Sequence, residues 1–244
     1  MQLAQILFTQ GFGTRRICAG IVASGRVRIG GRIVDDPHAE FDTAGLVFEV
    51  EGRPWPYIER ALLMLHKPAG YECSQKPRHH PSVLSLLPQP LRTRGVQPVG
   101  RLDEDTTGLL LLTDDGTLIH RLTSPKWHVP KVYEVGTKHP VDDAQIARLL
   151  AGVVLDDDPA SVRAAACERS GERSLTLTLT EGKYHQVKRM VAAAGNRVET
   201  LHRSAFGELR LSPDLPPGSW RFVDAHEIDA VSTGPVAGLP DAAT

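Results

Sequence analysis

Residues 100–116 read GRLDEDTTGLLLLTDDG, a polar loop with three carboxylates that is followed directly by an apolar run. The four leucines after Gly108 predict a buried strand, and the Asp-Asp-Gly sequence beyond them predicts a turn. A polar loop at the end of a buried strand is a common position for catalytic side chains. On the residues alone, acids that only cap and solvate a turn explain the loop equally well, so both interpretations stay open.

The first fifty residues predict a small separate module. Apolar residues at helical spacing over 3–8, and a capping Thr14 before a second apolar stretch, predict two helices. Residues 26–34 alternate polar and apolar around a Gly-Gly pair, which predicts a β-hairpin. Residues 1–34 hold five arginines and no carboxylate, although the whole chain has a net charge of -1. A merely solvated face is the alternative, but the repulsion among these cations favours a polyanionic partner such as RNA.

The rest of the chain predicts a larger domain that mixes helices and strands. The two prolines of Arg53-Pro54-Trp55-Pro56 predict an extended linker. Periodicity and capping residues predict a strand at 62–65, a helix at 142–150, a strand at 175–180 and a helix at 184–194. The predicted organisation is a module at 1–52, a linker at 53–60, a domain at 61–230 and, from its small and proline-bearing residues, a disordered tail at 231–244.

Composition argues against several classes of protein. The three cysteines lie far apart, which fits neither a disulfide scaffold nor a zinc site. Ten histidines suggest a metal site, but His79, His80, His128 and His185 are not accompanied by cysteines or carboxylates at ligand spacing, so we expect no metal and no cofactor. The chain shows no charged and apolar leader and no long apolar run, and we therefore expect a cytoplasmic protein without membrane contact.

The stretch at 100–116 resembles the signature of the pseudouridine synthases that act on ribosomal RNA. Three further blocks are similar to blocks of that family and occur in the family's order: LHKPAGY at 65–71, KVYEV at 131–135 and EGKYHQVKRM at 181–190. Residues 14–16 and 25–31 resemble the S4-type RNA-binding domain. His66 departs from the pattern, because most relatives have asparagine there, and the role of that side chain stays open.

The resemblance implies an α+β fold, with a small N-terminal RNA-binding domain and a catalytic domain around a mixed, largely antiparallel sheet. It implies that Asp103 is the catalytic carboxylate, either as a nucleophile or as a base at the sugar. It implies that Lys188 keeps this carboxylate ionised and that Tyr133 stacks on the uracil. Arg101 is expected to fill the space that the flipped base leaves, the alternative being an ion pair with neighbouring acids of the loop.

The expected partner is RNA, contacted by Arg15, Arg16, Arg26 and Arg28. Segments 123–133 and 184–190 are most similar to the branch that acts on one uridine of 16S ribosomal RNA, so we expect that RNA, or a partly assembled small subunit, as the partner of a monomeric enzyme. Three alternatives are a synthase for 23S ribosomal RNA, a non-catalytic RNA-binding assembly factor and a glycoside hydrolase that uses two of the clustered acids. The intact catalytic residues disfavour a silent factor, and the basic hairpin disfavours the hydrolase.

Overall fold

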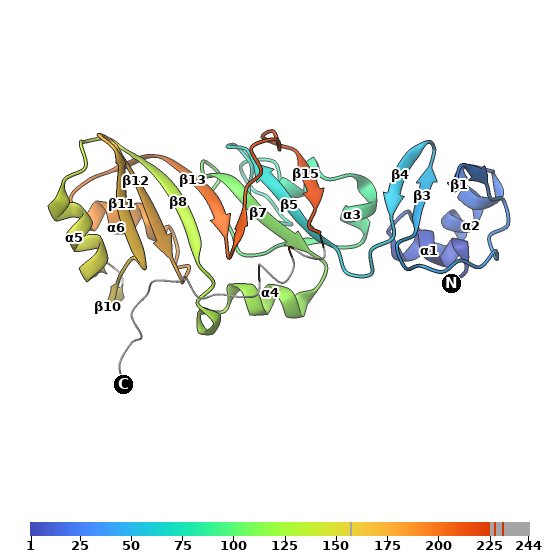
Figure 1. Cartoon of the computed structure of the whole chain (residues 1–244), viewed down its shortest axis with the longest axis horizontal. Helices are drawn as coiled ribbons and strands as arrows, with labels where there is room; N and C mark the ends of the chain where they lie inside the picture. The colour runs from blue at the N-terminus through green and yellow to red at the C-terminus, as the bar shows by residue number, and fades with distance from the viewer. Residues whose placement is uncertain (157, 225–226, 228–230, 232–244) are drawn as a thin grey trace. The chain divides into compact units, whose positions relative to one another are not determined.

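The computed structural model describes residues 1–156, 158–224, 227 and 231 (Figure 1). The chain divides into two compact units. The first contains Met1–Ala61 together with Leu87–Gln97, and the second contains Leu62–Leu86 together with Pro98–Thr244. No helix in the described ranges is long and apolar enough to cross a membrane.

The first unit contains the predicted helical pair and the predicted hairpin. The Thr14 side chain caps the second helix by accepting a hydrogen bond from the Ile17 backbone N–H at 3.3 Å. The helices are α1 (Leu3–Thr9), α2 (Arg15–Ala23) and α3 (Gln89–Thr93). The strands are β1 (Val27–Ile29), β2 (Arg32–Ile33), β3 (Val47–Val50) and β4 (Arg53–Pro56), in the sheet order β2-β1-β3-β4. The hairpin prediction is confirmed by the antiparallel pairing of β1 with β2.

Strand β4 corrects the prediction of a linker at 53–60. It pairs antiparallel with β3 and lies at the edge of the sheet. An edge strand tolerates prolines because it needs ladder hydrogen bonds on one side only. The residues after β4 are also held within this unit, since the Arg94 guanidinium donates to the carbonyls of Ile58 at 2.8 Å and Glu59 at 3.0 Å.

The second unit is built on a mixed sheet with the strand order β11-β12-β8-β13-β7-β5-β15, visible in Figure 1. Of the neighbours in this order, β13 and β7 are parallel and the other pairs are antiparallel, which confirms the predicted α+β class. The strands are β5 (Leu62–Lys67), β7 (Thr107–Thr113), β8 (Lys131–Thr137), β11 (Ala166–Gly171), β12 (Ser174–Leu179), β13 (Val198–Phe206), β14 (Leu209–Arg210), which pairs with β13, and β15 (Trp220–Phe222). The chain enters the second unit after Ala61, returns to the first after Leu86 and enters the second again within β6 (Gln97–Pro98).

Helices cover part of this sheet. Their bounds, with those of the remaining short elements, are α4 (Gly116–Thr123), α5 (Asp143–Ala151), α6 (Gln186–Ala193), the 3-10 helices η1 (Val83–Leu86) and η2 (Pro125–Trp127), and the paired strands β9 (Val153–Leu155) and β10 (Asp158–Val162). A buried core joins β8 and β12 to α5 and α6, through Val135, Leu177, Leu149 and Met190 among others. The two helices predicted at 142–150 and 184–194 are thus present as α5 and α6.

Most of the tail predicted at 231–244 lies outside the described residues. Its first residue, Val231, is buried in a second apolar core that also contains Leu109 and Leu111. Residues 232–244 lie outside the described residues. The prediction of disorder is therefore wrong for Val231, whose apolar side chain packs against the sheet, and it stays a prediction for the remainder.

Strand β7 confirms the prediction made from the leucine run, because Leu109–Leu112 are all fully buried. Covered on both faces, the strand needs no polar residue in alternation. The strand starts beside a close backbone contact at Gly108, whose φ is +109°. A Cβ atom at this position would lie 2.3 Å from the carbonyl oxygen of Arg203 on β13. Only glycine therefore permits β7 and β13 to meet here.

Candidate active site

The loop that carries Asp103 is fixed by a buried lysine. Lys67, at the end of β5, is fully buried, and its Nζ donates to the carbonyls of Pro68 at 3.0 Å, Glu104 at 2.9 Å and Thr106 at 2.8 Å. Burial lowers the pKa of Lys67, and this effect is opposed by Cys73 and the loop carboxylates. The sequence marked Lys67 only as part of a family block; in the structure it sets the shape of the loop.

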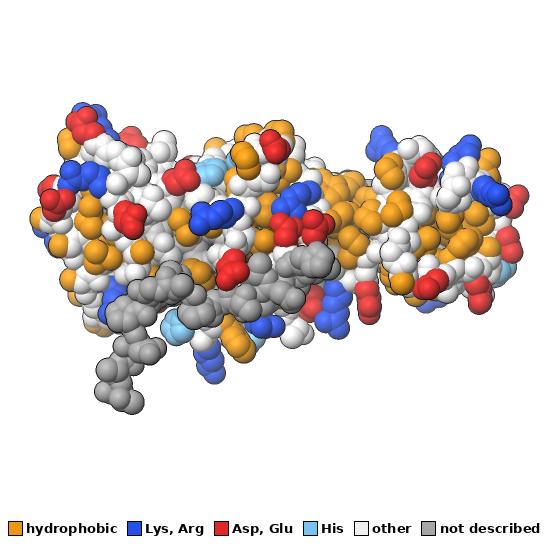
Figure 2. Space-filling model, viewed as in Figure 1, with side chains coloured by type: hydrophobic (Ala, Val, Ile, Leu, Met, Phe, Trp, Pro, Cys, Tyr) orange, Lys and Arg blue, Asp and Glu red, His pale blue; other side chains and the backbone are white. Residues whose placement is uncertain are grey.

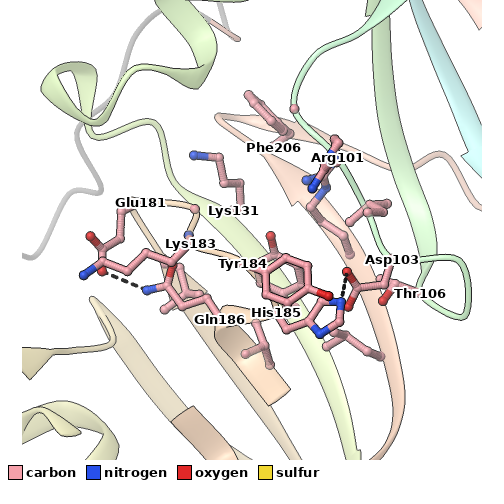
Figure 3. Close-up of a pocket in the computed structure, with 18 of the residues that line it drawn as sticks. Arg101, Asp103, Thr106, Lys131, Glu181, Lys183, Tyr184, His185, Gln186 and Phe206 are labelled. Atoms are coloured by element: carbon pink, nitrogen blue, oxygen red, sulfur yellow. Dashed lines mark hydrogen bonds and ion pairs between the residues drawn. The ribbon is translucent and has the colours of Figure 1, made fainter. Parts of the chain in front are cut away.

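Asp103 lies beside two side chains from the start of α6. Its Oδ2 is 3.0 Å from Nζ of Lys188. Its Oδ1 is 3.2 Å from Nε2 of His185 (Figure 3). The structure therefore brings together the predicted carboxylate and the predicted cation, which are far apart in the sequence. His185 was not among the predicted residues, although it belongs to the same family block as Lys188.

Lys188 also binds Asp105, which sequence reasoning did not foresee. Its Nζ donates to both carboxylate oxygens of Asp105, at 2.7 and 2.9 Å. Burial alone would lower the pKa of Lys188, but its bonds to Asp105 and Asp103 outweigh burial and raise it. Burial likewise raises the pKa of Asp105, yet the bond from Lys188 outweighs it, and the net pKa is lowered. The cation is therefore firmly charged and shared by two carboxylates.

The turn before α6 is held by Gln186, which is buried. Its Oε1 accepts a hydrogen bond from the Lys183 backbone N–H at 2.7 Å, and its Nε2 donates to Oε1 of Glu181 at 2.8 Å (Figure 3). His185 then adopts a left-handed backbone with φ +48°, and the exposed Tyr184 ring stacks on its imidazole with centroids 3.8 Å apart. This turn presents an aromatic surface beside the carboxylate.

A cavity of about 340 Å³ opens next to Asp103. It is lined by residues from the loop at 99–106, from β8 and β13, and from the turn at 181–187 (Figure 3). Tyr133 and Arg101, both predicted site residues, line it as well. Tyr133 lies on β8 and pairs in register with Leu177 on one side and Arg203 on the other.

Arg101 does not make the ion pair that was weighed as its alternative role. Asp105 is held by Lys188, and Glu104 lies 3.6 Å from Nε2 of His80. The exposed Arg101 side chain faces the cavity that Asp103 also lines (Figure 3). The role expected for Arg101, to fill the space that the flipped base leaves in the RNA stack, stays a prediction.

Two further cations line the same cavity, and sequence reasoning assigned them no role. Lys131 on β8 is 8% exposed and Arg203 on β13 is 2% exposed. Burial, and secondly Arg203, lower the pKa of Lys131 to about 8, whereas Glu181 acts in the opposite direction. Both cations lie over the Phe206 ring, at 5.4 and 5.2 Å from its centroid. Lys131 belongs to the family block at 131–135, but nothing in the sequence indicated that it and Arg203 line the same cavity.

The four predicted RNA-binding arginines of the first unit are all exposed. Arg15 donates to Oε1 of Gln5 at 2.7 Å and lies over the Phe8 ring, and Arg28 donates to the Gly31 carbonyl at 3.1 Å. Figure 2 shows acidic as well as basic side chains on the visible face of this unit. The expectation that these cations lack acidic neighbours is wrong for Arg26, which pairs with Glu51 at 3.2 Å. This acid lies outside the segment 1–34 that was considered.

Comparison with known proteins agrees with this arrangement. A family model described as RNA pseudouridylate synthase matches residues 61–193, and an S4 domain model matches residues 1–43. A Bacillus subtilis (strain 168) protein named "Uncharacterized RNA pseudouridine synthase YtzG" is 39% identical over 232 residues, which cover 93% of this chain and 97% of that protein. The "Ribosomal small subunit pseudouridine synthase A" of Yersinia pestis is 38% identical over 232 residues, covering 95% of this chain and 98% of that protein.

A solved structure titled "Crystal structure of pseudouridylate synthase" has a TM-score of 0.68 and 34% identity, and the match covers 95% of this chain and 99% of that one. The family model thus spans more than half of the chain, and the relatives match it over nearly their full lengths. The carboxylate loop, the buried strand after it and the turn before α6 all lie within the matched residues. This chain belongs to the RNA pseudouridylate synthase family.

Proposed function

We propose that this RNA pseudouridine synthase converts one uridine of small-subunit ribosomal RNA, with Asp103 as the carboxylate that acts at the sugar. The reaction breaks the C1′–N1 bond, turns the uracil and joins C1′ to C5. C5 loses a proton and N1 gains one, so substrate and product are isomers and no co-reactant is consumed. The observation that carries the assignment of Asp103 is its ion pair with Lys188 at 3.0 Å, at the edge of the cavity.

Four side chains have distinct roles in this proposal. Asp103 attacks the base or removes a proton from the ribose, and either step requires an ionised carboxylate. Lys188 opposes the loss of hydration that the target nucleotide would cause, because it supplies a fixed positive charge. Tyr133 offers its ring to the extruded uracil from the cavity wall, and Arg101 compensates for the few kcal/mol that extrusion costs.

The proposed substrate rests on relatives. Proteins named ribosomal small subunit pseudouridine synthase A match this chain over nearly its full length, and the S4-like first unit offers exposed arginines to phosphates. A ribosomal RNA substrate would also place the enzyme in the cytoplasm. We propose that the enzyme acts as a monomer. Light scattering of the enzyme with and without RNA tests this stoichiometry.

The test of Asp103 is the variant Asp103→Asn, which keeps the shape of the side chain and removes its charge. We expect the single-turnover yield of pseudouridine on 16S transcript or partly assembled small subunit to fall by at least about 100-fold. Asp105→Asn is the matched comparison, and it should lose far less because Lys188 keeps its bond to Asp103. Retention of more than about a hundredth of the rate in Asp103→Asn would remove the assignment. Equal yield on 23S transcript would overturn the choice of substrate.

A further inference from the structure

Lys131 and Arg203 are two buried cations that the proposed mechanism does not yet use. Both side chains are more than nine-tenths buried, and both line the cavity beside Asp103. Nε of Arg203 donates to the Leu109 carbonyl at 2.8 Å, whereas its buried Nη2 has no hydrogen-bond partner among the described residues. Within the same residues, no carboxylate forms an ion pair with either cation. Burying unpaired charge is costly, and such groups are normally compensated by a partner.

The register of the sheet places these cations next to Tyr133. Lys131 and Tyr133 are two residues apart on β8, so their side chains leave the same face of the sheet. Arg203 is the residue directly opposite Tyr133 on β13. All three side chains therefore lie together on the wall of the cavity, and a base that stacks on Tyr133 would have both cations close to its edge.

The chemistry of the uracil identifies what these cations would bind. When the C1′–N1 bond breaks, its electron pair stays on the base, and the charge spreads over N1, O2 and O4. Cations in a site with little water stabilise such charge far more strongly than they would in solvent. A phosphate is the other anionic group of the nucleotide, but it is already charged before the reaction and would be held equally in the ground state.

We infer that Lys131 and Arg203 form a subsite that stabilises the negative charge developing on the uracil as the glycosidic bond breaks. This inference rests on the proposed function, because it requires the uracil to stack on Tyr133 with its sugar at Asp103. The two cations would lower the energy of the transition state through their charge, acting on the uracil as it leaves the sugar. Lys188, by contrast, acts on the carboxylate at the sugar.

The test compares two substrates whose bases differ as leaving groups. Fluorine at C5 withdraws electrons and stabilises the uracil anion, so RNA with 5-fluorouridine at the target should depend less on the cations. The variant Lys131→Met replaces the cation by an apolar chain of similar length. Its control is Lys138→Met, which removes an exposed lysine just beyond the end of the same strand. Circular dichroism verifies that both variants are folded.

We expect Lys131→Met to lower the single-turnover rate on uridine RNA by about 100-fold or more, as for the loss of one donor to a developing anion. Loss of the N-glycoside from 5-fluorouridine RNA should fall at least tenfold less, and the Kd for RNA should change less than threefold. Lys138→Met should leave all three quantities unchanged. An equal loss of rate on both RNAs, or a rise in Kd that accounts for the loss, would overturn the inference and indicate that Lys131 binds a phosphate instead.

Failure of this inference and failure of the proposed function give different results. If Asp103→Asn is inactive while Lys131→Met reacts at the normal rate, the carboxylate assignment survives and the cation subsite is wrong. If Asp103→Asn stays active, the proposed function itself fails, whatever the result for Lys131. A second variant, Arg203→Lys, keeps a charge but shortens the reach to the cavity, and it should show the same dependence on the leaving base as Lys131→Met.

Discussion

Replacing Lys131 by methionine is expected to stabilise the protein near pH 7 by about 2 kcal/mol. Burial lowers the pKa of this lysine from its ordinary value of 10.5 to about 8. Each pKa unit corresponds to about 1.4 kcal/mol, so holding the charged form in the fold costs about 3 kcal/mol. The variant removes this cost but also loses the contact of the cation with the Phe206 ring, which is worth about 1 kcal/mol.

The sign of the pH dependence follows from the lowered pKa. Below about pH 8 the lysine is charged in the folded and the unfolded protein, and the full cost is present. As the pH rises from about 8 to 10.5, the folded protein releases its proton first, and the cost disappears. Urea unfolding of the original protein and of Lys131→Met, near pH 7 and near pH 10, measures this change in the free energy of unfolding. The reasoning would be refuted if the variant were less stable than the original protein near pH 7. It would also be refuted if the difference in their free energies of unfolding were the same near pH 7 and near pH 10.

Three further predictions concern the other cations. Lys67→Met should lower stability by about 3 kcal/mol in the same urea assay, because three backbone carbonyls lose their shared donor. Unchanged stability would mean that water replaces the lysine as the donor. Lys188→Met should raise the pKa of Asp105 in an NMR titration and lower the single-turnover rate at least about 100-fold, whereas Lys188→Arg should keep most of the rate. An unchanged pKa of Asp105 in Lys188→Met would contradict its bond to Lys188. Replacing Arg15, Arg16 and Arg28 together should reduce the slope of log affinity for RNA against log salt concentration by about 2 to 3. Arg26→Met should change this slope less, since Glu51 already pairs with Arg26. An unchanged slope in the triple variant would show that these arginines do not contact RNA phosphates.

The local elements of this protein were predictable from sequence because their signals are local. Thr14 caps α2, and the leucine run after Gly108 forms a buried strand, each for reasons contained in a few neighbouring residues. The segment Arg53–Pro56 was misread because proline excludes a central strand but not an edge strand, and periodicity does not distinguish the two.

The candidate catalytic cluster was only partly predictable for a different reason. Asp103 and Lys188 were found through family blocks, but the second partner of Lys188, Asp105, depends on how the loop meets α6 in space. That Lys131 and Arg203 line one cavity depends in the same way on how β8 lies against β13, where Lys131 is opposite Phe206 and Arg203 is opposite Tyr133. Contacts between distant segments leave no periodic trace in the sequence, so they became visible only in the folded chain.

The close contact at Gly108 has a consequence for how this enzyme can diversify. The loop with Asp103 continues directly into β7, and Arg203 lies on β13, so the contact between these strands sets the spacing between the acid and the buried cations. At this contact the spacing of the two strands is set by backbone atoms, while the Lys67 side chain holds the loop itself. Any side chain at position 108 would push β7 away from β13 and shift the loop with Asp103 relative to Arg203, so we expect changes of RNA target to arise at other positions that line the cavity.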